Sequence, residues 1–379
     1  MILSCIAVLK PLLAALAIVA PQDGAVVPTQ KDVQKSFFSG SRDERFQRLS
    51  NPADCARLFA AGQTQQPLRL EWTGADTNAV CSLKIVREGG DLESFVVTNR
   101  TVIYVTNLEL GARYHWSVFD GRDTAAGTFT TEPDAPRFLR AEGVGNFRDL
   151  GGWRTAGGRR VRQNMIFRSA GLRSSSKAKG GLFSTKVIPG IRRVKDAGLA
   201  TLRDEFKIRT DLELRTPQET AGMGTTLLGP GVKWVNESFA AYDFIDSPSR
   251  GKGPFGRIFK IFANEASYPV LMHCSGGRDR TGTLAFLLNG LLGVSEDDLR
   301  RDWEATIFAD NGPSLTSYRL MRLLDYLKTY PGDTMQEKIE VYVKSCGVTD
   351  DEIAAFRKIM LEDVQSKEEG GKSDGNEDL

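Results

Sequence analysis

The sequence predicts an α/β domain with a parallel-rich central sheet flanked by helices, preceded by a small all-β sandwich domain. Three observations support this prediction. Short runs rich in β-branched and aromatic residues recur at regular spacing over residues 46–132. After a proline-rich linker at residues 133–136, apolar runs without polar alternation and stretches of helical periodicity replace them. The 379 residues are also enough for two domains.

The first 20 residues have the features of a signal peptide. Residues 11–20 (PLLAALAIVA) are apolar, and small residues stand at cleavage positions such as Ala17 and Ala20. Lys10 and Pro11 interrupt the apolar stretch, which disfavours a membrane-spanning helix and leaves a buried N-terminal helix as the alternative. No other stretch is apolar enough to span a membrane. We therefore expect a secreted or periplasmic protein in which the polar residues 21–45 form an irregular spacer.

Six β-rich runs, separated by turn signals, predict the sandwich over residues 46–132. They cover residues 68–73, 80–87, 92–98, 101–107, 113–119 and 126–131. The runs LEWTG, SLKIV, NLELGARYHWSVFD and GTFTTEP resemble a fibronectin type III or related immunoglobulin-like module. We expect Trp72 and Trp116 to be core aromatics rather than a ligand platform. The sandwich is also a candidate surface for a protein partner.

Charge and cysteine content narrow the function classes. The net charge of +2 gives no overall field for nucleic acid, so any recognition of anions has to be local. With His115 and His273 as the two histidines, and no zinc-type cysteine spacing, we expect no metal and no other cofactor. Cys55 and Cys81 would be able to pair in an oxidising compartment, and the sequence leaves that question open.

The α/β domain is expected over residues 136–363. Its predicted strands cover residues 207–213, 232–236 and 269–273, and its predicted helices lie within residues 191–203, 255–266, 283–292, 296–308, 315–327, 334–344 and 350–363. Ser295 and Thr349 occupy N-cap positions, each followed three residues later by an acidic residue. The charged, glycine-rich residues 364–379 are expected to form a disordered tail.

The run HCSGGRDRTG (residues 273–282) carries the chemistry. It joins a buried strand to an apolar helix through small residues, which allow successive backbone N–H groups to turn toward an anion at the helix N-terminus. A thiol at Cys274 would ionise more readily there and become a nucleophile. The planar fork of Arg280 suits two phosphate oxygens. A tight turn around an inert buried cysteine is the alternative, but it gives no reason for two arginines and an aspartate in a glycine turn.

The same run resembles the signature loop of protein tyrosine phosphatases, and is most similar to the bacterial group with aspartate before the loop arginine. VGNFRDLGGW (residues 144–153), MIFRSAGL (165–172) and IRTDLELRTPQE (208–219) are similar to further signatures of that group, so the resemblance spans residues 136–363. It implies a cysteine-dependent phosphoric monoester hydrolase. Substrates of this class are phosphoproteins or small phosphorylated molecules.

The resemblance implies a role for each residue of the loop. Cys274 would form a phosphocysteine intermediate, Arg280 would bind the phosphate and stabilise the transition state, and Thr281 would steady the thiolate. Asp279 would protonate the leaving oxygen and then activate water. The remaining loop residues, Ser275, Gly276, Gly277 and Arg278, would bind the substrate.

Two questions stay open at this point. Many relatives take the general acid from a mobile loop, which makes Asp243 or Asp246 an alternative to Asp279. The group usually has lysine where this chain has Arg278, so its substrate preferences do not transfer directly. Phosphotyrosine is the expected substrate, with phosphoserine or phosphothreonine beside it. The alternatives are inositol phosphates or phosphoinositides, and a non-catalytic phosphate-binding module.

Several polar residues outside the loop have two interpretations. Asn146, Arg148 and Asp149 are expected either to contact the phosphate loop or to brace the sheet edge. We expect Arg168 and Arg215 to pair with nearby carboxylates, and His273 to brace the loop. The basic cluster of Arg154, Arg159, Arg160 and Arg162 is expected to lie on a solvated face.

Overall fold

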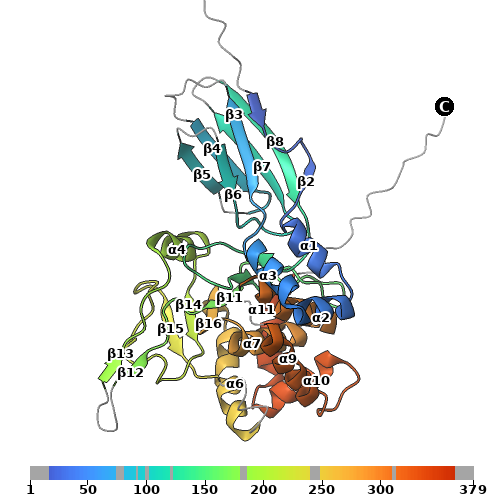
Figure 1. The fold of residues 1–379 in the computed structure, drawn as a ribbon, viewed down its shortest axis with the longest axis vertical. Helices are drawn as coiled ribbons and strands as arrows, with labels where there is room; N and C mark the ends of the chain where they lie inside the picture. The colour runs from blue at the N-terminus through green and yellow to red at the C-terminus, as the bar shows by residue number, and fades with distance from the viewer. Residues whose placement is uncertain are drawn as a thin grey trace, which may run out of the picture.

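The structure is a computed structural model that describes residues 17–73, 81–90, 93–98, 102–119, 123–179, 186–239, 248–309 and 313–362. A β-rich N-terminal part and a mixed α/β part lie end to end, with three short helices between them (Figure 1). Within these residues no helix combines the length and the apolar character needed to cross a membrane. The predicted tail, residues 364–379, and residues 1–16 of the predicted signal peptide lie outside the described residues. The prediction of a signal peptide over residues 1–20 disagrees with the structure at its end, because Ala17–Val19 form a strand that pairs with residues 71–73 of the β-rich part.

The N-terminal part contains two small sheets with a shared core. One has the order β1-β3-β6, and the other has the order β2-β8-β7-β4-β5. The strands are β1 (Ala17–Val19), β2 (Ala25–Val27), β3 (Leu68–Thr73), β4 (Cys81–Arg87), β5 (Glu93–Thr98), β6 (Val102–Val105), β7 (Arg113–Phe119) and β8 (Thr124–Thr131). Trp72 and Trp116 are buried in the common core, as expected, and the six predicted strands are confirmed with shifts of no more than two residues at any end.

The expectation of an irregular spacer over residues 21–45, followed directly by strands, is wrong. Residues 25–61 form β2 and three helices, α1 (Asp32–Phe38), α2 (Arg42–Ser50) and α3 (Pro52–Ala61). Ser41 and Asn51 cap the second and third helices through their side chains. The helices are polar on most of their surface, and their few buried apolar residues pack against Phe138 and Phe308 of the α/β part.

The cysteine pairing left open by the sequence is not formed. Cys55 lies in the helical cluster around α3, whereas Cys81 lies in the core between the two small sheets. Both thiols are free and buried.

The α/β part is built on a six-stranded sheet with the order β15-β14-β16-β11-β10-β9. The first four strands are parallel, and β10 pairs antiparallel with both of its neighbours, β11 and β9. The strands are β9 (Arg137–Phe138), β10 (Arg148–Asp149), β11 (Ile166–Ala170), β14 (Thr210–Glu213), β15 (Lys233–Asn236) and β16 (Val270–Cys274), and a separate hairpin joins β12 (Lys177–Lys179) to β13 (Lys186–Ile188). The predicted parallel-rich sheet is therefore confirmed, with Cys274 at the end of a central strand.

Helices cover both faces of this sheet. The side chains of β16 alternate, so that Val270 and Met272 pack on one core and Leu271 packs on the other. The first core belongs to the C-terminal helices, namely α6 (Pro248–Phe262), α7 (Asp279–Leu291), α8 (Glu296–Glu304), α9 (Pro313–Leu327), α10 (Met335–Ser345) and α11 (Asp350–Met360). The 3₁₀ turn η2 (Glu265–Ser267) precedes β16, and the 3₁₀ turn η3 (Ala305–Phe308) packs against α1 to α3 instead. The second core includes α4 (Asp196–Ala200) and the π-helical turn η1 (Thr201–Glu205). Ser295 and Thr349 cap α8 and α11 as predicted.

The β-rich part meets the α/β part at residues 107–110, which connect β6 to β7. Side-chain amides bind the backbone of this segment. Gln65 bonds the N–H and C=O of Leu108 at 2.9 and 2.8 Å, and Gln163 bonds those of Leu110 at 2.8 and 3.0 Å. The segment is therefore fixed through its main chain.

Two arginines complete this junction. Arg137 donates to the carbonyl groups of Asn107 at 2.6 Å and Leu108 at 3.1 Å. Arg160 donates to the carbonyl groups of Leu110 at 3.2 Å and Pro133 at 2.7 Å. The prediction of a solvated basic face is thus wrong for Arg160, which is partly buried at the junction.

Candidate active site

The predicted phosphate loop connects β16 to α7. Cys274 is the last residue of the strand and is 3% exposed, and Asp279 is the first residue of the helix. Thr281 is fully buried in the first turn of α7, and its hydroxyl makes no hydrogen bond within the described part of the chain. The strand–loop–helix arrangement expected from the sequence is confirmed, and it brings the α7 N-terminus to the nucleophile.

The carbonyl groups of the loop point outward. Those of Ser275, Gly276 and Gly277 each accept a hydrogen bond from a group outside the loop. In a trans peptide the N–H points away from the carbonyl that shares its plane. The N–H groups of Gly276, Gly277 and Arg278 therefore point the opposite way, into the loop, as an anion cradle requires. Gly277 has a φ of +66°, which favours glycine.

Side chains from three other segments of the chain hold these carbonyl groups. The side-chain amide of Asn146 donates to the carbonyl of Gly276 at 3.1 Å, and Arg168 donates to that of Gly277 at 2.7 Å. Arg193, which is exposed, donates to that of Ser275 at 3.3 Å. These contacts orient the cradle without occupying it.

A buried ion cluster contacts the residues that hold the loop. Asp302 of α8 accepts hydrogen bonds from both Arg148 and Arg168, and Arg148 also donates to the side chain of Asn146. Burial alone would raise the pKa of Asp302, but Arg168 and Arg148 outweigh that effect and lower it. Asn146 thus contacts the loop directly and Arg148 acts through it, whereas Asp149 pairs with Arg137 and braces the sheet edge.

Glu219 holds the loop arginine. Its carboxylate accepts hydrogen bonds from Arg280 at 2.6 and 2.9 Å in a bidentate pair. The hydrogen bond from Arg280 lowers the pKa of Glu219 to about 2. Sequence reasoning did not assign Glu219, although it ends the run IRTDLELRTPQE that supports the family resemblance.

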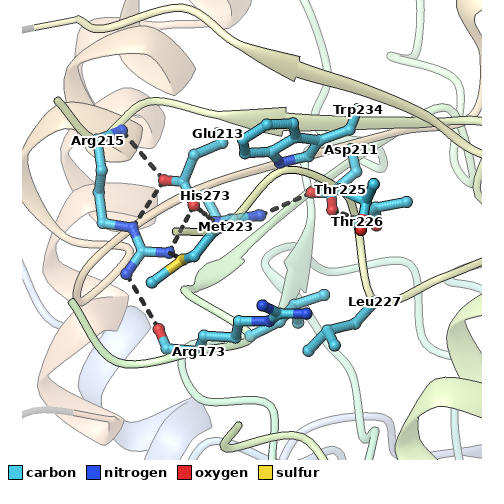
Figure 2. Close-up of a pocket in the computed structure, with 11 residues that line it drawn as sticks. Arg173, Asp211, Glu213, Arg215, Met223, Thr225, Thr226, Leu227, Trp234 and His273 are labelled. Carbon is cyan, nitrogen blue, oxygen red and sulfur yellow. Dashed lines mark hydrogen bonds and ion pairs between the residues drawn. The ribbon is translucent and has the colours of Figure 1, made fainter. Parts of the chain in front are cut away.

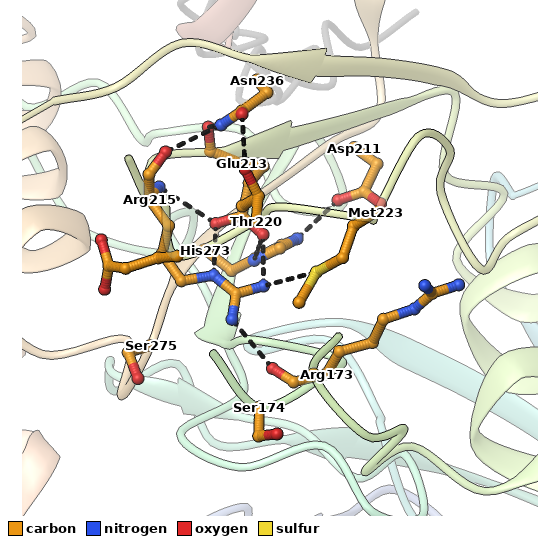
Figure 3. A network of polar contacts seen from close by, with 12 residues as sticks. Arg173, Ser174, Asp211, Glu213, Arg215, Thr220, Met223, Asn236, His273 and Ser275 are labelled. Carbon is orange, nitrogen blue, oxygen red and sulfur yellow. Dashed lines mark hydrogen bonds and ion pairs between the residues drawn. The ribbon is translucent and has the colours of Figure 1, made fainter. Parts of the chain in front are cut away.

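His273, next to the nucleophile, is enclosed by carboxylates (Figures 2 and 3). Its Nε2 lies 2.6 Å from Asp211, and its Nδ1 lies 3.5 Å from Glu213. Burial lowers the pKa of His273, but Glu213 and Asp211 outweigh it and raise the pKa to about 9. Arg215 pairs with Glu213 at 2.6 Å, which confirms the predicted pairing of Arg215 with a carboxylate. His273 binds carboxylates of the neighbouring strand β14, and its role in bracing the loop stays a prediction.

This network borders a small cavity (Figure 2). The cavity has a volume of about 20 Å³, which is room for about one water molecule. Asp211, Glu213 and His273 line one side of it, and Thr226, which donates to Asp211 at 2.5 Å, lines another. The charges beside Cys274 are therefore shielded from bulk solvent.

Of the candidate general acids, the structure describes Asp279 but not Asp243 or Asp246. Asp279 contacts the guanidinium group of Arg319 on α9, and Nε of Arg278 lies 3.4 Å from its other oxygen. Asp243 and Asp246 lie outside the described residues. Sequence reasoning missed Arg319 and Asp302 because they lie on helices far from the loop in sequence, where no local pattern marks them.

The described residues contain no group of three His, Cys, Asp or Glu side chains that could hold a metal ion.

Comparisons with known proteins find similar proteins of known family. A provisionally named tyrosine-protein phosphatase from Cupriavidus necator is 27% identical over 179 residues, which are 44% of this chain and 65% of that protein's length. The core catalytic domain of the PP-IP phosphatase SIW14 from S. cerevisiae, solved with citrate, is 18% identical, with 52% of this chain and 90% of that chain covered and a TM-score of 0.27. The model of the tyrosine phosphatase family matches residues 139–185 and 189–362. The chain therefore belongs to the tyrosine phosphatase family, whose members are phosphoric monoester hydrolases.

Proposed function

We propose that this protein hydrolyses phosphate monoesters through a phosphocysteine intermediate on Cys274, with phosphotyrosine as its substrate. The observation that carries the proposal is the orientation of the peptide groups in the phosphate loop. The loop carbonyl groups bond to residues outside the loop, which turns three consecutive N–H groups toward its interior. Glu219 holds Arg280, on which the charge of Cys274 also acts. A phosphate dianion fits this combination of donors.

The reaction follows from these positions. The Cys274 thiolate attacks phosphorus, the bond from phosphorus to the ester oxygen breaks, and that oxygen takes a proton from Asp279. Water then attacks the phosphocysteine, gives its proton to the Asp279 carboxylate, and releases inorganic phosphate and the thiolate. Arg280 and the loop N–H groups stabilise the charge that develops on the phosphoryl oxygens in both steps.

Asp279 can act as the acid only when it leaves its arginine partners. A bound phosphate dianion offers Arg278 and Arg319 another anionic partner, which would release the carboxylate toward the leaving oxygen. In an Asp279→Asn variant, kcat on phenyl phosphate should fall far more than kcat on nitrophenyl phosphate, whose leaving group needs no proton. An equal loss on both substrates would assign the acid to another residue, with Asp243 the next to test.

Inositol phosphates are a second candidate substrate class because the loop has arginines around it. Arg193 donates to the loop carbonyl of Ser275, and Arg278 and Arg319 flank Asp279. Several guanidinium groups around the loop suit a substrate that carries more than one phosphate. A panel of phosphotyrosine peptides and inositol polyphosphates, compared by kcat/KM, decides between them. A higher kcat/KM for the inositol polyphosphates would reject phosphotyrosine as the main substrate.

The decisive test of catalysis is hydrolysis of nitrophenyl phosphate under reducing conditions. Wild type should turn over, and Cys274→Ser should lose at least about a thousandfold in kcat because the nucleophile is gone. A folded wild-type protein that binds phosphate without hydrolysing the ester would instead be a phosphate-binding module, and the catalytic proposal would be wrong.

We further propose that the protein is exported and that its N-terminal part, a fibronectin type III-like module, binds a protein partner. The apolar residues 11–20 and the resemblance of residues 46–132 to such modules support this. Sequencing the N-terminus of the protein from its own cells tests export, since an uncleaved Met1 would contradict it.

A further inference from the structure

Gln63 lies in the connection between α3 and β3, upstream of the residues that match the family. Its side-chain amide bonds the main chain on both sides of Gly145. The Nε2 donates to the carbonyl of Val144 at 3.2 Å, and the Oε1 accepts from the N–H of Asn146. Asn146 has a φ of +53°, a conformation that few residues other than glycine and asparagine adopt readily. Gln63 therefore clamps an unusual turn.

That turn faces the phosphate loop. Asn146 is 2% exposed, and its side chain donates to the carbonyl of Gly276. The same peptide unit carries the N–H of Gly277, which points into the anion cradle. Asn146 is thus the one residue that connects Gln63 to the N–H of Gly277.

The connection that carries Gln63 is itself held. Gln34 of α1 is fully buried and donates to the carbonyl groups of Gly62 at 2.9 Å and Thr64 at 3.2 Å, on either side of Gln63. Lys31 donates to the carbonyl of Ala61 at 2.6 Å. These bonds hold the main chain around Gln63 in place.

The helices α1 to α3 also grip the helix that carries Asp302. Arg45 of α2 is fully buried and donates to Glu304 at 2.6 Å, two residues beyond Asp302. Phe37 packs edge-on against Phe308 of η3 with a centroid distance of 5.8 Å. The N-terminal helices are thus connected to the loop in two ways. One connection runs through Gln63 and Asn146, and a longer one runs through the segment that carries Asp302.

We propose that Gln63 is a positioning residue of the phosphate loop, and that residues 30–66 are part of the catalytic scaffold although they precede the family-matched region. The proposal rests on the proposed phosphate site at Cys274. It predicts that loss of the Gln63 amide lowers anion affinity through Asn146, with no contact between Gln63 and the anion.

The experiment compares three variants of the full-length protein. Gln63→Met keeps the length of the side chain but removes both hydrogen bonds, and Gln63→Glu keeps an acceptor for the N–H of Asn146. Gln66→Met is the control, because Gln66 is exposed in the same connection. For each variant, calorimetry gives the Kd of tungstate, a phosphate mimic, nitrophenyl phosphate hydrolysis gives kcat and KM, and unfolding gives Tm.

We expect Gln63→Met to weaken tungstate binding by about three- to tenfold, the effect of one net hydrogen bond, and to lower kcat/KM in proportion. Gln63→Glu should lose less, and Gln66→Met should match wild type. A Gln63→Met variant with a lower Tm but unchanged tungstate affinity would reduce Gln63 to a structural role and overturn the proposal.

A double-mutant cycle tests whether Gln63 acts through Asn146. In an Asn146→Ala background, Gln63→Met should change tungstate affinity by less than about twofold, because the link is already cut. Full additivity of the two changes would overturn the proposal. A wild type that binds tungstate but hydrolyses no ester would contradict the proposed catalysis alone, since the affinity readout would still measure positioning. A wild type that does not bind tungstate would refute both.

Discussion

Replacing Glu219 by glutamine tests whether Arg280 has to be held in place to bind phosphate. The two hydrogen bonds between them measure 2.6 and 2.9 Å, and the side chains are 28% and 18% exposed. A hydrogen bond to a charged group contributes about 1.5–3 kcal/mol when shielded and less when partly exposed. Glutamine keeps one acceptor, so we expect a loss of about 1–2 kcal/mol in transition-state binding, or about 5- to 30-fold in kcat/KM.

The stability of the same variant should depend on pH. Arg280 lowers the pKa of Glu219 from the usual 4.5 to about 2. A carboxyl whose pKa is lowered by folding stabilises the protein fully above pH 4.5, and that contribution is lost as the pH falls toward 2. Urea unfolding should therefore show Glu219→Gln less stable than wild type at pH 7, and nearly equal to it near the lower end of that window.

Glu340 provides a matched control. It accepts a hydrogen bond from Arg357 at 2.7 Å and is 27% exposed, but it lies on α10 outside the loop and its supports. Glu340→Gln should lose a similar amount of stability and keep wild-type kcat/KM. If Glu219→Gln lowered kcat/KM no more than Glu340→Gln does, the positioning of Arg280 by Glu219 would be refuted.

Two further predictions concern the residues on either side of the nucleophile. Because the pKa of His273 is raised to about 9, its charged form stabilises the fold fully below pH 6.5, and that contribution is lost as the pH rises through 9. Asp211→Asn should thus lower Tm more at pH 6 than at pH 10, and an equal loss at both pH values in thermal unfolding would contradict the assignment. At Gly277, with φ of +66°, a Cβ would lie 2.4 Å from the carbonyl oxygen of Ser169, whereas a Cβ at Gly276 would meet nothing within 4 Å. Gly277→Ala should cost about 2 kcal/mol or more in urea unfolding and Gly276→Ala much less; similar costs would show that the loop relaxes around the added methyl group.

The sequence predicted the elements whose patterns are strong and local. The strands of the N-terminal part alternate in hydrophobicity, and β16 is a short apolar run, so both were predictable. The helices α1 to α3 were not predicted, because their exposed surfaces are polar and their short apolar stripe is recognisable only once Phe138 and Phe308 complete it. Tertiary packing, rather than helix periodicity, defines these helices.

The candidate site likewise contains residues that the sequence predicted and residues that only the structure shows. Cys274, Asp279, Arg280 and Thr281 lie within one run of eight residues, so local spacing was enough to find them. The groups that orient them come from distant segments, where Glu219, Asp302 and Gln63 look like ordinary polar residues. Their roles depend on which backbone carbonyl or guanidinium group lies beside them, and that is set by the packing of sheet and helices.

The junction at residues 107–110 has a consequence for how the two parts of the chain can diverge. Gln65, Gln163 and Arg137 bind main-chain atoms there, and main-chain atoms are the same for almost every amino acid. Substitutions at Leu108 or Glu109 therefore leave these bonds available, whereas inserting or deleting one residue would shift every donor and acceptor out of register. Among homologues, this turn should therefore stay constant in length.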